Sequence, residues 1–499
     1  MRSATSLASH LAWMSAITVV AALIRAFAQE GIPLYPDSYQ FMLLTRGLSE
    51  SLPVTSAMGL AGDPWAIPFH KLGYSLFTWP FSPLGDDPFR PGLIASFVAG
   101  TATVPIVYLL VLVALRSRLA AVGAATVMAL SFSAVIWSRF VMSEAVAMFW
   151  IALTLLLAAL AGRVRHPCFG VLTAMSAALM ILTRLELVLL LPTVVLLTHG
   201  QDRRDWSFER RYLLPSGLLV LAAFSILWGW LAQDIAEGLS LHPGYLLRSA
   251  FSGWAGTDRA SGPPLGVGLW NFVGHEPLLV LLTALGVSGA LRRRDKRLLP
   301  LAPGLILLLL TKGNDFRFLA TAVPLLACIA GYGVEFLGEW SMLRLRELGD
   351  NRALALSAVI SFGVVILLFL QVAQTESRPL PDKGYEYELA QKIEEHVQAQ
   401  HLEDALVCTY SPEAVHLVTE FAVRRLSSPQ LTNCKEGGTN PREVLVIVDE
   451  GIRRHFGDAF EQEVRAAGTL LFEMPIDAPY LDGSATIKNH LPATAYLLR

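Results

Sequence analysis

Charged residues are scarce in this sequence, and their scarcity decides the class of protein. Only 16% of the 499 residues are Asp, Glu, Lys or Arg, whereas soluble domains carry about 25%. The mean hydropathy is correspondingly high, at +0.50. No basic block resembles a nucleic-acid footprint, and the net charge of −2 indicates no partner. These deficits argue against an ordinary soluble enzyme and against a nucleic-acid-binding protein.

Other signals of soluble catalysts are also missing. No glycine pattern that cradles phosphate occurs in the C-terminal region, and His242 and His275 are lone histidines without metal-ligand spacing. The chain has only four cysteines. Cys168 and Cys328 fall in apolar segments, where they are expected to act as small packing residues. Cys408 and Cys434 lie near the C-terminus, and the sequence leaves open whether they form a disulfide or remain two thiols.

Long apolar runs are abundant, and they predict a polytopic helical membrane protein. A spanning helix needs about 20 mostly apolar residues, because the hydrocarbon core of a bilayer is about 30 Å thick. We expect eleven transmembrane helices, which lie near 8–28, 93–115, 119–137, 145–162, 167–183, 186–199, 212–232, 277–291, 298–311, 318–338 and 353–373.

The distribution of Lys and Arg predicts the orientation. With the N-terminus in the cytoplasm, sixteen basic residues fall in the short inner loops and nine in the longer outer loops. This asymmetry places residues 374–499 outside. The sequence "RAFAQE" (25–30) is similar to a signal-peptidase site, but Arg25 directly before it is unusual there. We therefore favour an uncleaved first span; cleavage would leave the C-terminal region outside.

After residue 373 the composition changes, and two domains are expected: a transmembrane domain, 1–373, and an extracytoplasmic domain, 374–499. Residues 374–388 are polar and contain proline, as in a linker. Alternating segments then predict a small α/β domain, with helices at 388–400, 412–426 and 456–468 and strands at 404–410, 443–449, 469–475 and 493–499.

Asp37, in "YPDSYQF" (35–41), follows the first span on the outer side. Tyr39 and its aromatic neighbours suit an interfacial segment, and apolar residues at 41, 44 and 48 predict a helix over 37–50 that lies on the membrane. A carboxylate is favoured at such an N-terminus. Asp37 therefore serves either as a helix cap or as a reacting group, and one role does not exclude the other.

Other charges also gather at the outer ends of spans, where ionisable groups are candidates for function. They lie in "PFHKLGYSLF", "WSRFVMSEA", "LTRLEL" and "TKGNDFRF" and are Lys71, Arg139, Glu144, Arg184, Glu186 and Arg317. The alternatives are snorkelling side chains and mutual ion pairs. Carboxylates beside arginines at one membrane depth favour a shared site.

In its order of segments, the chain resembles the membrane glycosyltransferases of the C-type (GT-C) fold, related to protein O-mannosyltransferases and lipid A aminoarabinose transferases. The likeness covers most of 8–373. It includes the outer Asp37, the lysine stretch, both Glu-bearing turns and "NDFRFLATAVPLLACIAGYGVEFL" (314–337), which has Phe318 where the family has tyrosine. The double proline after the lysine and an Asp-x-Asp metal motif are absent.

The resemblance implies transfer of a sugar from a polyprenyl-phosphate donor to a hydroxyl, with inversion and with Asp37 as general base. Lys71, Arg184 and Arg317 would bind the donor phosphate. Substrate-orienting residues would be Arg139, Glu144, Glu186 and Tyr39. The acceptor would be a lipid, a glycan or a protein, and the membrane a bacterial inner (plasma) membrane. No cofactor is certain, and a divalent cation remains open.

Three other functions remain in view. A transporter or flippase is expected to show mid-span charges and half-chain repeats, whereas these charges lie at span ends and no repeat is visible. A polymerase or ligase of lipid-linked glycans would use similar chemistry with different basic loops. A non-catalytic assembly protein would function without Asp37.

Overall fold

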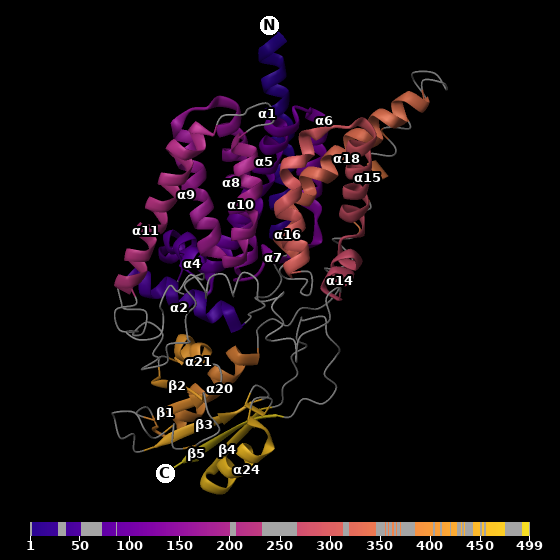
Figure 1. Cartoon of the computed structure of the whole chain (residues 1–499). Helices are drawn as coiled ribbons and strands as arrows, with labels where there is room; N and C mark the ends of the chain where they lie inside the picture. Colours follow the sequence, from indigo (N-terminus) through magenta and orange to yellow (C-terminus); the bar gives the residue numbers. More distant parts are fainter. Residues whose placement is uncertain are drawn as a thin grey trace.

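The protein is described here from a computed structural model, in which a helical bundle stands above a small C-terminal sheet (Figure 1). The described residues are 2–27, 36–50, 72–85, 87–199, 206–231, 267–312, 319–345, 355, 358, 362–363, 366, 370, 385–402, 405–409, 412–419, 421–426, 431, 434, 443–449, 452–453, 456–474 and 492–498. The N-terminal helix begins at the far end of the bundle from the sheet (Figure 1).

The described first half of the bundle contains both long and short helices. Its elements are α1 (Arg2–Phe27), α2 (Pro36–Glu50), α4 (Leu72–Thr78), η2 (Trp79–Leu84), α5 (Arg90–Leu115), α6 (Arg118–Leu130), α7 (Phe132–Trp137), α8 (Ser143–Val164), α9 (Pro167–Thr183), η3 (Leu185–Leu190) and α10 (Leu191–His199). The second half consists of η4 (Glu209–Leu213), α11 (Leu214–Leu231), α14 (Val267–His275), α15 (Pro277–Arg293), η5 (Lys296–Leu301), α16 (Ala302–Lys312) and α18 (Val323–Leu345).

Several helices are long and apolar enough to cross a membrane. Among the described residues three meet that test alone: Leu7–Phe27, Arg90–Leu115 and Ser143–Val164. A fourth is counted if α14 and α15, which meet at a bend of 101°, form one broken span. Shorter apolar helices accompany them, so the chain is a multi-pass membrane protein. The number eleven stays a prediction, and most of 353–373 lies outside the described residues.

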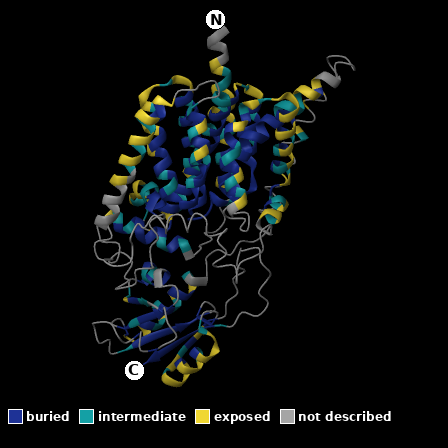
Figure 2. Cartoon of the chain, viewed as in Figure 1, coloured by how far each residue is buried: buried dark blue, intermediate teal, exposed yellow. Residues whose placement is uncertain are grey.

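The bundle is packed in its interior and apolar on its outside. Buried residues fill its centre (Figure 2), whereas Leu219 on α11 is 71% exposed, as expected of a side chain that faces lipid. Helices α15 and α18 cross closely at Gly286 and Gly333. A Cβ atom at either glycine would collide with a backbone carbonyl of the other helix. Close approach through glycine is a common way for membrane helices to associate.

The predicted third span is broken, because Ser131 is extended between α6 and α7. The break frees backbone groups, and two buried charges take them up. On one side, Arg25 of α1 donates to the carbonyls of Met128 and Ala129, at 3.2 Å from the latter. On the other side, Glu276 accepts from Ser131 Oγ at 2.5 Å and from the amide of α7's second residue at 2.7 Å. The positive side chain of Arg25 thus lies at the carbonyl end of α6, and the negative side chain of Glu276 lies at the amide end of α7, as the helix dipoles favour.

The C-terminal region forms a five-stranded mixed sheet in the order β2-β1-β3-β5-β4. Strands β1 (Leu406–Thr409), β2 (Val423–Arg425) and β3 (Val444–Val448) are parallel, and β5 (Ala493–Leu498) is antiparallel to both β3 and β4 (Thr469–Met474). The helices are α20 (Tyr385–Ala399), α21 (Pro412–Thr419) and α24 (Asp458–Ala467).

The predicted helix over 412–426 is wrong in its last third. The helix ends at Thr419, and Val423–Arg425 forms β2 instead, with Val423 in register with Val407 of β1. An edge position beside a buried strand suits a β-branched residue, so tertiary pairing overrides the local helical pattern. The other predicted helices and strands of this region are present with small shifts of their ends.

The C-terminal region rests on the bundle through α21 and α20. Helix α21 packs against α2, and Figure 1 shows the two one above the other. Tyr387 of α20 meets Phe89, just before α5, edge to face with ring centroids 5.8 Å apart. The apolar core runs without interruption from the bundle into the inner face of the sheet, including Leu417 and Leu445. The sheet is therefore held directly beneath α2.

Candidate functional site

Helix α2 carries Asp37 in its first turn and is covered on several sides. Residues 41–45 are all buried, because α4, α21 and η2 pack around them. A helix lying on the membrane surface would show an exposed face here, so α2 is instead an internal element between the bundle and the C-terminal region. Asp37 itself is half-buried at the start of this helix. The predicted helix over 37–50 is confirmed.

Helix α4 lies between α2 and the end of α9. Ser75 donates its hydroxyl hydrogen to the carbonyl of Phe41, at 3.0 Å. Gly73 sits against Thr183, and an added Cβ would meet the Thr183 Oγ1 at 2.6 Å. Because α4 begins at Leu72, directly after Lys71, this packing brings the chain next to Lys71 against the end of α9.

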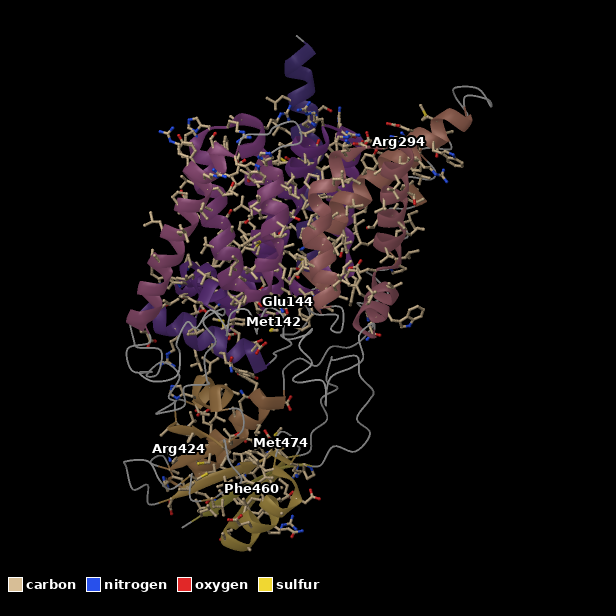
Figure 3. All side chains as sticks on the ribbon, in the orientation of Figure 1. Met142, Glu144, Arg294, Arg424, Phe460 and Met474 are labelled. Carbon is tan, nitrogen blue, oxygen red and sulfur yellow. The ribbon has the colours of Figure 1, made fainter. Side chains whose placement is uncertain are left out.

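The turn between α7 and α8 approaches the start of α2. Ser38, the neighbour of Asp37, has its hydroxyl 3.7 Å from the Met142 sulfur. Met142 and Glu144 lie where the bundle meets the lower half of the molecule (Figure 3). Arg139, earlier in the same turn, is only 4% exposed. The segment "WSRFVMSEA", which holds the candidate site residues Arg139 and Glu144, is therefore buried beside the helix that carries Asp37.

Arg184 joins this turn to the next one. Its Nη1 donates to Glu144 Oε1 and its Nε donates to Glu186 Oε1, each at 2.5 Å. The three residues are 4%, 0% and 7% exposed, respectively. A planar guanidinium suits two carboxylates at once, because it presents several donors in a fixed fork. Arg184 is thus held in place by two acids, and the three side chains together carry a charge of −1.

Tyr39 lies two residues beyond Asp37 and is 1% exposed. Its ring meets Phe89 edge to face, with centroids 5.6 Å apart. Since Phe89 also contacts Tyr387, a row of three aromatic rings connects α2 with the C-terminal region. Sequence reasoning missed Phe89 and Tyr387, because nothing local marks two aromatics so far apart in the chain as neighbours.

Glu276 is a further residue that the sequence analysis missed. It is fully buried and holds the start of α7, which leads into the turn bearing Arg139. Its position directly before a predicted span was a signal from which Glu276 could have been named as a candidate.

Two predicted site residues, Lys71 and Arg317, lie outside the described residues. The structure thus brings together α2, the 138–144 turn and the 183–186 turn. The positions of Lys71 and Arg317 in the site stay predictions. In the part of the chain that is described, no group of three His, Cys, Asp or Glu residues is arranged to hold a metal ion.

This arrangement is that of the C-type (GT-C) membrane glycosyltransferase fold. Residues 70–230, which include both Glu-bearing turns, match the family model of dolichyl-phosphate-mannose-protein mannosyltransferases. The resemblance found in the sequence is confirmed. Comparison with curated protein sequences gives no significant match.

Two solved structures illustrate the likeness. One is ArnT from Cupriavidus metallidurans bound to undecaprenyl phosphate, with a TM-score of 0.59 and 12% identity over 97% of this chain and 98% of that one. The other is the archaeal oligosaccharyltransferase AglB from Archaeoglobus fulgidus, in complex with an inhibitory peptide and a dolichol-phosphate. It has a TM-score of 0.57 and 13% identity over 96% of this chain and 75% of AglB.

Proposed function

We propose that the protein transfers a sugar from a polyprenyl-phosphate donor to an acceptor hydroxyl at the outer face of the membrane, with inversion. The observation that carries this proposal is the convergence, around the start of α2, of two short turns rich in buried charge. ArnT and AglB, which share the fold, are each solved with a polyprenyl phosphate. A donor of that chemical class therefore fits this chain.

Asp37 is the proposed general base. It takes the proton of the acceptor hydroxyl as that oxygen bonds to the anomeric carbon, while the bond from that carbon to the phosphate oxygen breaks and its electrons leave on the lipid phosphate. A hydroxyl is a weak nucleophile, so a positioned base is needed. Partial burial of Asp37 at a helix start supports the role, because the carboxylate is both held in place and accessible.

The leaving phosphate gains charge in the transition state and needs cations nearby. We propose Lys71 and Arg317 as its ligands. Lys71 directly precedes α4, whose Gly73 touches the residue before Arg184. For Arg184 the two salt bridges favour a different role: it anchors Glu144 and Glu186, since a phosphate would have to compete with two carboxylates at 2.5 Å.

The remaining predicted residues act by positioning. Glu144 is fully buried, so it orients Arg184 rather than a sugar hydroxyl. Tyr39 fixes the first turn of α2 through its contact with Phe89. Glu186 and Arg139, at 7% and 4% exposure, lie at the edge of the same cluster and are proposed to meet the substrate.

The proposal is tested with Asp37→Asn in membranes given a polyprenyl-phosphate sugar. Transfer is expected to fall by about 10²–10⁴-fold, the usual contribution of a positioned base. Glu50→Gln, at the other end of the same helix, is the matched control, because Glu50 is exposed and lies 3.0 Å from its neighbour Arg46 in a surface ion pair. Full activity of Asp37→Asn refutes the base assignment.

Transfer of a preassembled lipid-linked glycan is the second candidate, because AglB is described as an oligosaccharyltransferase. The product separates the two: mass spectrometry of the acceptor shows either one sugar or a whole glycan added per event. A transporter, in contrast, would move the lipid donor without forming any product.

A further inference from the structure

Two of the four cysteines lie together on the outer face of the C-terminal sheet. Cys408 and Cys434 are both fully buried, in a cluster with Leu426, Leu431 and Val446. This cluster is on the face covered by α24, opposite the face that packs toward α20 and α21. Both residues are free thiols in the structure.

The path of the chain brings the two residues together. Cys408 lies in β1, and the chain leaves the neighbouring strand β2 at Leu426, whose amide donates to the Thr409 carbonyl at 3.0 Å. Leu431 and Cys434, which pack in the same buried cluster as Cys408, are joined by a bond from the Cys434 amide to the Leu431 carbonyl at 3.1 Å. The thiols of Cys408 and Cys434 then share a hydrogen bond.

That contact also determines the chemistry of the pair. The hydrogen bond with Cys434, together with burial, raises the pKa of the Cys408 thiol. A thiolate is the form that reacts in disulfide exchange. Once the domain has folded, the Cys408 thiol is therefore protonated, and both cysteines are shielded from solvent. A bond between them has to form while the domain is folding, when both are still accessible.

We propose that Cys408 and Cys434 form an intramolecular disulfide in the mature protein. This inference rests on the extracytoplasmic placement in the proposed function, because disulfides persist in oxidising compartments. Two S–H bonds break and one S–S bond forms. Two protons are released, and the two electrons reduce the disulfide of a thiol oxidoreductase of that compartment to a dithiol.

The disulfide closes a loop that contains α21. This helix begins at Pro412 and ends at Thr419, between the two cysteines, and it packs against α2, the helix that carries Asp37. The disulfide would lie on the face of the sheet that α24 covers, and the loop it closes contains α21, which packs the opposite face of the sheet against α2. Loss of such a bond destabilises mainly by freeing the unfolded chain.

The test counts thiols in the full-length protein. Cells are quenched in acid, the protein is denatured, and free thiols are alkylated with a maleimide-polyethylene glycol that shifts the gel mobility. Two additions are expected without reductant, at Cys168 and Cys328, and four after reduction. Cys408→Ser is expected to give three additions in both cases, because the loss of one partner frees Cys434.

Each outcome can be assigned. The side of the membrane is read independently from phosphatase and fluorescent-protein fusions at the C-terminus. Four additions without reductant, in a protein whose fusion reports an outer C-terminal region, overturn the disulfide and leave the proposed function standing. Four additions without reductant, in a protein whose fusion reports a cytoplasmic C-terminal region, overturn both the disulfide and the proposed function. A reductant-sensitive dimer on the gel overturns the intramolecular pairing.

Discussion

Replacement of Arg184 by alanine would test whether this residue anchors the site or binds the donor. In the wild type, one guanidinium serves two carboxylates, each at 2.5 Å, and the cluster is almost shielded from water. Arg184→Ala leaves Glu144 and Glu186 buried without that cation. Breaking a buried pair by removing one partner costs about 3–5 kcal/mol, because an uncompensated charge remains.

The loss is measured as the unfolding temperature in detergent. For domains of a few hundred residues, one kcal/mol corresponds to about 2–4 °C, so a loss of about 3–5 kcal/mol should lower the unfolding temperature by roughly 6–20 °C. Glu186→Gln is the matched control: it removes one of the two carboxylates and leaves the bond between Arg184 and Glu144, so a much smaller fall is expected. Arg184→Lys should lie between the two, because an ammonium lacks the planar fork.

A triple variant extends the argument. With Arg184→Met, Glu144→Gln and Glu186→Gln together, all three charges joined by the two salt bridges are removed, and much of the stability lost in Arg184→Ala should return. If Arg184→Ala instead melts like the wild type and raises the KM for the lipid donor, Arg184 is a phosphate ligand and the anchoring role is wrong.

Three further outcomes are expected. Gly73→Val should push α4 away from Thr183, lower the free energy of unfolding by about 1–3 kcal/mol and reduce transfer, whereas an unchanged melting curve would contradict the close packing seen there. Phe89→Ala removes a ring between α2 and α20 and should expose the C-terminal region to protease, measured by limited proteolysis; wild-type digestion rates would argue against the aromatic contact. Asp295 has its pKa lowered to about 2, first by the hydrogen bond from Arg297, so it stabilises the fold above its ordinary pKa of 3.8, and this contribution disappears as the pH falls through about 2. Asp295→Asn should therefore lower the unfolding temperature at pH 7 and match the wild type near pH 2; equal stability at pH 7 would contradict the shift.

The sequence was most informative where structure follows from local pattern. Apolar runs placed the long helices, and the residues around Asp37 predicted a helix that the structure has as Pro36–Glu50. The strands at 443–449 and 493–499 were also found, since a short β-rich apolar run identifies a buried strand. These features depend on neighbours along the chain.

Contacts between distant residues were beyond local pattern. The sequence left open mutual ion pairs among these charges, and the structure shows that Glu144 pairs with Arg184, forty positions away. Glu276 and Arg25 meet the break at Ser131 from other helices, and no periodicity announces such partners. Helix α2 was expected to lie on the membrane surface, but the packing of α21 covers it.

The position of β5 has a consequence for how the chain matures. Among the strands of the described residues this one is last in the sequence, yet it lies between β3 and β4 and bonds to both. Until β5 has been synthesised, β4 lacks the neighbour that joins it to β3, and the three parallel strands stand without the antiparallel pair. A chaperone that shields unpaired strand edges would be needed longest here, and truncations that remove this strand should leave a protein that inserts normally but is degraded from its tail.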